Sequence, residues 1–127
     1  MILLTKAIVE YLETQGIGVF GTDIFIGTRP PKPINCLTLY DTGGFKPKKD
    51  TTSNPTFQII GRHKSYVDGF ANIKEAHNHL KEKYNFWLKE NKIWVLLLEA
   101  QGEPGKIGKE KDNYLFSCNY HLWLKYY

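Results

Sequence analysis

The C-terminal part of the chain reads Tyr114-Leu115-Phe116-Ser117-Cys118-Asn119-Tyr120-His121-Leu122-Trp123-Leu124-Lys125. Every second residue from Tyr114 to Leu124 is apolar or aromatic, and the positions between them are mostly polar, with Leu115 and Trp123 as exceptions. Because side chains alternate between the two faces of a strand, this pattern predicts a long β-strand with one buried face. A sheet with one face against a core follows from it.

Shorter runs of β-branched and aromatic residues predict further strands. They cover residues 23–27, 36–40, 57–62, 86–88 and 93–101. Short connections between neighbouring strands favour antiparallel pairing.

Two segments have the spacing of amphipathic helices. The first runs to about Gln15, with Gly16 as its C-terminal cap. The second covers about residues 66–84, with Ser65 as N-cap and Asp68 at the acidic position of a capping box. The order helix, three strands, helix, three strands predicts an α+β fold with both helices packed on one face of a mainly antiparallel sheet.

One apparent nucleotide-binding motif occurs, Gly16-Ile17-Gly18-Val19-Phe20-Gly21, which matches G-x-G-x-x-G. That fingerprint binds a dinucleotide only where a strand precedes it and a helix follows. Here a helix precedes and a strand follows. We therefore interpret these glycines as the end of a helix and a turn.

Composition indicates one globular domain over residues 1–127, since the hydrophobic content is 42%. The net charge of +4 is a modest excess of basic residues. Cys36 and Cys118 lie in apolar strand patterns and are expected to be buried free thiols. No C-x-x-C pair suggests zinc, the N-terminus does not read as a signal peptide, and apolar runs are too short to cross a membrane.

No catalytic or metal-binding pattern is found in the sequence. His77 and His79 lie two apart on a predicted helix, where side chains diverge, so His77 is expected to be structural. Arg62, His63 and Lys64 could bind an anion at a helix N-terminus, but we favour a solvated turn at this position. We expect no catalytic residue, no cofactor and no metal.

Two long extended loops are expected, over residues 41–55 and 102–113, and such loops are uncommon in a small domain unless they have a task. The first carries Lys46, Lys48 and Lys49; the second carries Lys106, Lys109 and Lys111. These lysines could be solubilising charges. They could also contact phosphates, with Phe45, Tyr66 or Tyr114 stacking on bases. Alternatively, the loops reach neighbouring subunits of a ring or tube.

Aromatic residues make up 14% of the chain, and Trp and Tyr are favoured at protein interfaces. Trp87 and Trp94 could equally pack beneath the helices. The expected interface residues are Phe45, Lys46, Lys48, Lys49, Lys106, Lys109, Trp123, Tyr126 and Tyr127.

Several segments, in this order, resemble the small minor capsid or tail-terminator-like proteins of long-tailed phages and related prophages of Gram-positive bacteria. They are YLETQGIG (11–18), GTDIFIG (21–27), LYDTGG (39–44), NPTFQI (54–59) with Arg62 and Tyr66, QGEPGKIG (101–108) and YLFSCNY (114–120). The chain departs from that family at Asn85-Phe86-Trp87-Leu88, where a short glycine-containing link would follow the second helix.

The resemblance implies a virion protein of the tail or neck, made in the host bacterial cytoplasm and without an active site or membrane contact. Similar proteins form a ring, usually of six copies, that caps the tail tube and faces the head connector or stopper protein. DNA would pass through such a ring, and the long loops would contact the tube or adjacent subunits. Two alternatives stay open: another head–tail connector or completion component, and a nucleic-acid-binding module that uses the basic loops.

Overall fold

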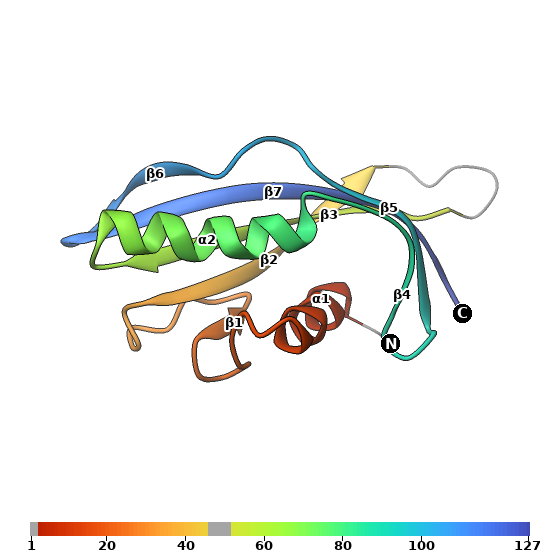
Figure 1. Cartoon of the computed structure of the whole chain (residues 1–127), viewed down its shortest axis with the longest axis horizontal. Coiled ribbons are helices and arrows are strands. Elements are labelled where there is room, and N and C mark those ends of the chain that lie inside the picture. Colours follow the sequence, from red (N-terminus) through yellow and green to blue (C-terminus); the bar gives the residue numbers. More distant parts are fainter. Residues whose placement is uncertain (1–2, 46–51) are drawn as a thin grey trace.

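The computed structural model describes residues 3–45 and 52–127 of the chain. It contains two helices and a seven-stranded sheet, an α+β fold as predicted (Figure 1). The elements are α1 (Leu4–Thr14), β1 (Ile24–Ile26), β2 (Cys36–Phe45), β3 (Asn54–His63), α2 (Tyr66–Leu80), β4 (Glu82–Leu88), β5 (Ile93–Ala100), β6 (Gly105–Glu110) and β7 (Asn113–Tyr126).

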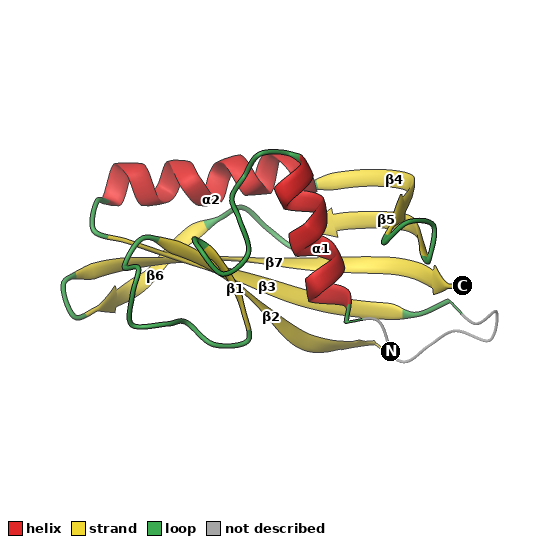
Figure 2. Cartoon of the chain, turned by 90° about the horizontal axis from the view of Figure 1, so that it is seen from below, coloured by secondary structure: helices red, strands yellow, loops and turns green. Residues whose placement is uncertain are grey.

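The strands follow the order β1-β2-β3-β7-β5-β4, and β6 also pairs with β7. The parallel pair is β1–β2, whereas the other named strands pair antiparallel. Strand β7 is the long C-terminal strand that the alternation predicts, and Figure 2 shows it running through the length of the molecule. Its alternate residues Phe116, Cys118, Tyr120, Leu122 and Leu124 are all buried. The prediction of a half-buried strand is therefore confirmed.

The glycines after α1 end the helix, as interpreted from the sequence. Gly16 has φ +76°, and its N–H donates to the carbonyl of Glu13, while the N–H of Ile17 donates to the carbonyl of Leu12. This pair of bonds is the Schellman arrangement, in which a left-handed residue satisfies the last helical carbonyls. The sequence G-x-G-x-x-G thus leads out of a helix and into β1.

Helix α2 begins as predicted but ends one turn earlier. The N–H of Asp68 donates to Ser65 Oγ (3.2 Å), and the N–H of Ser65 donates to His63 Nδ1 (2.9 Å). The helix stops at Leu80, and Tyr84, which the helical spacing includes, lies in β4 opposite Leu97. Strand pairing with β5 here outweighs the local helical pattern.

The prediction of a loop over residues 41–55 is wrong at both described ends, where residues 41–45 and 54–55 belong to paired strands. Strand β2 continues to Phe45, which pairs with Asn54 at the start of β3, and the register shifts between Asp41 and Gly44. Gly44 has φ +152°, and a Cβ there would collide with the carbonyl oxygen of Asn54. Glycine is required because the two backbones approach closely at this bulge. Lys46, Lys48 and Lys49 lie outside the described residues.

The prediction of a loop over residues 102–113 is also wrong in its central part, since residues 105–110 form β6, which pairs antiparallel with β7. A bulge lies between Lys106 and Gly108, and the large apolar residue Ile107 is 55% exposed. The strand lacks the apolar alternation by which strands are recognised, because it sits at an edge and buries little.

The core is one cluster that takes residues from both helices and the sheet. Helix α1 contacts β1, β2 and β4, whereas α2 contacts β3, β5 and β7. The fully buried side chains include Ile8 and Leu12 of α1, Ile73 and Leu80 of α2, and Phe57, Phe116 and Tyr120 of the sheet. Cys36 and Cys118 are buried free thiols, as predicted.

Candidate assembly surfaces

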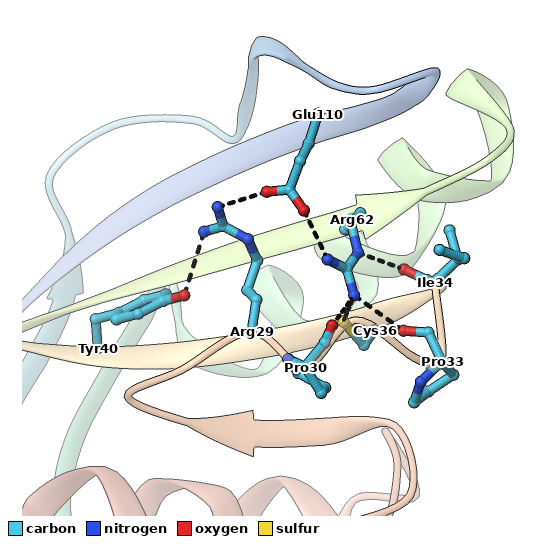
Figure 3. Close-up of polar contacts among 8 residues, drawn as sticks. All are labelled: Arg29, Pro30, Pro33, Ile34, Cys36, Tyr40, Arg62 and Glu110. Carbon is cyan, nitrogen blue, oxygen red and sulfur yellow. Dashed lines mark hydrogen bonds and ion pairs between the residues drawn. The ribbon is translucent and has the colours of Figure 1, made fainter.

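A buried arginine organises one end of the molecule (Figure 3). Arg62, on β3, is 3% exposed in its side chain and lies beneath the connection between β1 and β2. Its Nε donates to the carbonyl of Ile34 (2.9 Å), and its Nη2 donates to the carbonyls of Pro30 and Pro33. Its Nη1 bonds Glu110 Oε1 at 2.8 Å. The guanidinium therefore fixes a proline-rich connection that has no ladder hydrogen bonds of its own.

Glu110 joins this connection to the β6–β7 hairpin. Its Oε2 accepts from Arg29 Nη2 (2.8 Å), and Arg29 Nη1 also donates to Tyr40 Oη (3.2 Å). The hydrogen bonds from Arg29 and from Arg62 hold the pKa of the Glu110 carboxyl below its usual value. Arg62 is thus occupied within the molecule rather than held out toward an anion. The sequence does not predict this cluster, because its members come from three distant segments.

The β6–β7 hairpin carries the basic residues that the sequence marks as interface candidates. Lys109 Nζ lies 4.8 Å from the centre of the Tyr114 ring, and Lys106 Nζ lies 5.7 Å from it. Tyr114 packs edge-on against Tyr66, with 5.5 Å between ring centres. Neither lysine forms an ion pair with any described residue. Their positive charges are therefore available at the surface.

The β2–β3 hairpin packs onto β7 through aromatic rings. Phe45 lies 4.6 Å from His121, and His121 lies 3.8 Å from Trp123, measured between ring centres. Phe45 is 59% exposed, whereas Trp123 is half-buried. Burial lowers the pKa of His121, and its Nε2 has no hydrogen-bond partner among the described residues. The structure therefore brings Phe45 and Trp123, both predicted interface residues, into one row.

A second aromatic group surrounds the C-terminus. Trp87 of β4 contacts Trp94 of β5 (5.0 Å between ring centres) and Tyr127 (5.5 Å). Trp87, Tyr126 and Tyr127 are all exposed. Trp87 thus lies at the surface, although the sequence left its position open. Tyr127 is exposed as an interface residue would be, and it lies in a different group from Trp123.

One buried cluster has the residue types of a cysteine nucleophile site. His77 Nδ1 lies 3.5 Å from Cys118 Sγ and 2.9 Å from Tyr120 Oη, while His77 Nε2 lies 3.5 Å from Glu103 Oε2. Burial raises the pKa of the Cys118 thiol and lowers that of His77. Because a nucleophilic cysteine needs a depressed pKa and access to substrate, this geometry describes a neutral, buried hydrogen-bonded group. His77 is structural, as predicted.

Within residues 3–45 and 52–127, no group of three or more His, Cys, Asp or Glu side chains is arranged to hold a metal ion. Neither helix of the described part has the length and hydropathy needed to cross a membrane.

Comparison with known proteins identifies the class. The fold resembles that of a chain in the virion of a native gene transfer agent particle, with a TM-score of 0.64 and 14% identity. The alignment covers 82% of this chain and 79% of that one. A comparison with curated protein sequences gave no match.

The family is shown by sequence. A family model described as bacteriophage tail terminator protein matches residues 11–126. The chain therefore belongs to the bacteriophage tail terminator family, in agreement with the resemblance seen in its segments. It is a structural protein of a phage virion.

Proposed function

We propose that this protein forms a closed ring, of six copies, at the head–tail junction, where it ends the tail tube and joins it to the head connector or stopper protein. The family match over residues 11–126 carries this proposal. The exposed residues Phe45, Lys106, Lys109, Tyr126 and Tyr127, with the half-buried Trp123, supply surfaces for contacts between copies and to the tube. DNA would pass through the opening of the ring.

Electron microscopy of particles made without the protein tests this function. We expect separate heads and tails of irregular length, and normal joined particles when the protein is supplied in trans. Joined particles of normal tail length in its absence would contradict the proposal. Heads that fail to join tails of normal length would instead favour the alternative of another connector or completion component. Native mass spectrometry of the purified protein, alone and with tail tubes, gives the copy number.

A second candidate function is nucleic-acid binding by the β6–β7 hairpin. Two lysines that pair with no described acid lie beside Tyr114 and favour it, since lysine–phosphate contacts with neighbouring aromatic rings suit single strands. Fluorescence anisotropy with a labelled oligonucleotide tests it. Binding that weakens steeply with salt, and that Lys106→Ala/Lys109→Ala removes, would support this function.

We also infer that both helices cover the same face of the sheet. Asp41, Phe57 and Tyr120 form one cross-strand row of β2, β3 and β7, so their side chains share a face. Thr5 of α1 bonds Asp41 (3.1 Å), and His77 of α2 bonds Tyr120. These two contacts support a shared face.

A further inference from the structure

Two surfaces of opposite charge lie at different places along β7, since Lys106 pairs opposite Phe116 and Glu99 pairs opposite His121. The basic hairpin is formed by Lys106, Ile107, Lys109 and Lys111 of β6 and its turn into β7. The acidic face is formed by Glu82, Tyr84 and Trp87 of β4 and Glu99 of β5. Figures 1 and 2 both show the β6–β7 turn at one end of the long axis, whereas β4 begins beside the end of α2, near the middle of the molecule.

The basic hairpin has an excess of positive charge that no described residue neutralises by an ion pair. Glu110, the acidic residue of β6, is already paired with Arg29 and Arg62. The turn of the hairpin holds one further acidic residue, Asp112, whereas the hairpin holds three lysines. Ile107 adds an exposed apolar side chain between two of those lysines. The hairpin is therefore suited to an acidic surface that also offers apolar contact.

The acidic face has the complementary character. Glu82 and Glu99 are direct cross-strand partners, a like-charge pair that is unfavourable within one molecule. Neither glutamate forms an ion pair with a described residue. Both line a surface hollow of ≈ 360 Å³ that Lys81 also borders. Tyr84 and Trp87 are 59% and 43% exposed, and aromatic rings of this kind attract lysine ammonium groups.

We infer that the basic hairpin of one copy docks on the acidic face of the next copy, and that this head-to-tail contact is the one repeated around the ring. The inference rests on the proposed function, because it specifies the contact between ring subunits. The two surfaces lie along different stretches of one sheet, so they cannot meet within one chain. A contact between different surfaces of identical chains continues until the assembly closes, as a ring requires.

Charge reversal tests the pairing, with native mass spectrometry and light scattering as readouts. Lys106→Glu/Lys109→Glu makes both surfaces acidic, and Glu82→Lys/Glu99→Lys makes both basic. We expect each variant alone to associate at least about tenfold more weakly than wild type, since like charges then face each other. The exposed controls Lys32→Glu and Glu75→Lys, which lie outside both surfaces, should associate as wild type does. Circular dichroism and thermal melting establish that each variant is folded.

An equimolar mixture of the two variants provides the decisive measurement. The acidic hairpin of one variant then meets the basic face of the other, and the reverse, so every contact is complementary again. We expect multimers with alternating variants and an even number of copies. Variants that associate normally alone, or a mixture that stays dissociated, would overturn the pairing.

The outcomes separate this inference from the proposed function. A wild-type protein that stays monomeric, even with tail tubes, would contradict the ring itself. If the wild-type protein forms a ring and either charge-reversal variant alone forms the same ring, the pairing is contradicted and the ring is not. Loss of oligonucleotide binding in Lys106→Glu/Lys109→Glu, with normal multimers, would assign the hairpin to nucleic acid and also overturn the pairing.

Discussion

Arg62 and Glu110 are 48 residues apart in the chain, yet Arg62 Nη1 lies 2.8 Å from Glu110 Oε1. The bond crosses from β3 to the β6 strand, and the same guanidinium binds three carbonyl groups of the connection before β2. One side chain thus sets the position of the connection and of the basic hairpin together. Changes at this cluster should therefore affect stability and assembly jointly.

Arg62→Met should lower the free energy of unfolding by about 3 kcal/mol, because it leaves carbonyl groups unbonded in a buried site. Glu110 keeps Arg29 as a partner, which limits the loss. Chemical denaturation measures the change, and exposed Lys64→Met is the matched control. A loss no larger than that of the control would show that the connection holds its position without Arg62.

Glu110→Gln should flatten the dependence of stability on acidic pH. The two arginines lower the pKa of Glu110 in the folded state, so its contribution is present above the unfolded value of about 4.5 and is lost as pH falls through the folded pKa. As pH is lowered from about 5 to about 2, the melting temperature should fall less steeply for the variant than for wild type. Exposed Glu75→Gln serves as control, and parallel curves for all three proteins would refute the assignment.

His77 and His121 should both titrate below 6.5, the ordinary value for histidine, since burial disfavours their charged forms. A lowered folded pKa means that the unfolded chain takes up protons first. The stability that these residues contribute is thus complete above pH 6.5 and decreases as pH falls below it. NMR titration of the imidazole carbons, assigned with His77→Gln and His121→Gln, measures both values. An ordinary or raised pKa at either residue would contradict its burial.

Phe45→Ala should impair assembly more than folding. Phe45 is 59% exposed, so its removal should cost less than about 1 kcal/mol of folding free energy. Trp123→Ala should also reduce association, but its half-buried ring contacts His121 and should contribute more to stability. Thermal melting of monomers and yield of joined particles separate the two effects. Normal assembly by Phe45→Ala would remove that residue from the interface.

Gly44→Ala should destabilise the β2–β3 hairpin by about 1–3 kcal/mol, because the residue has positive φ and a Cβ would meet backbone of the facing strand. Gly102→Ala is the control, since no atom lies within 4 Å of a Cβ placed there. Hydrogen exchange at β2 and β3 should increase in the first variant alone. Unchanged protection in Gly44→Ala would mean that the bulge can rearrange at little cost.

The parts of the fold that bury an apolar face are predictable from sequence. The alternation in β7 and the glycines after α1 predict their elements correctly, because burial and left-handed geometry restrict the residue types. Strand β6 and the end of β2 are missed, since edge and hairpin positions bury little and tolerate lysine and glycine. Leu80 is followed by Tyr84 at helical spacing, and nothing in the local sequence reveals that Tyr84 pairs with Leu97.

The candidate surfaces are predictable only in part. Phe45, Lys106, Lys109, Tyr126 and Tyr127 are exposed as expected, because charge and large aromatic area are properties of single residues. Their grouping depends on register. The like-charge pair Glu82–Glu99 and the contact between Arg62 and Glu110 exist only once distant strands are aligned, so no local pattern could reveal them.

The irregular backbone of β6 and β4 has a consequence for the free protein. Strand β6 is interrupted between Lys106 and Gly108, and β4 contains Asn85 with φ 51°. Bulged outer strands that carry lysine offer a poor template for adding further strands, so chains should not stack into fibrils by extending their sheets. Contacts between copies should therefore be made through side-chain surfaces rather than through added strands.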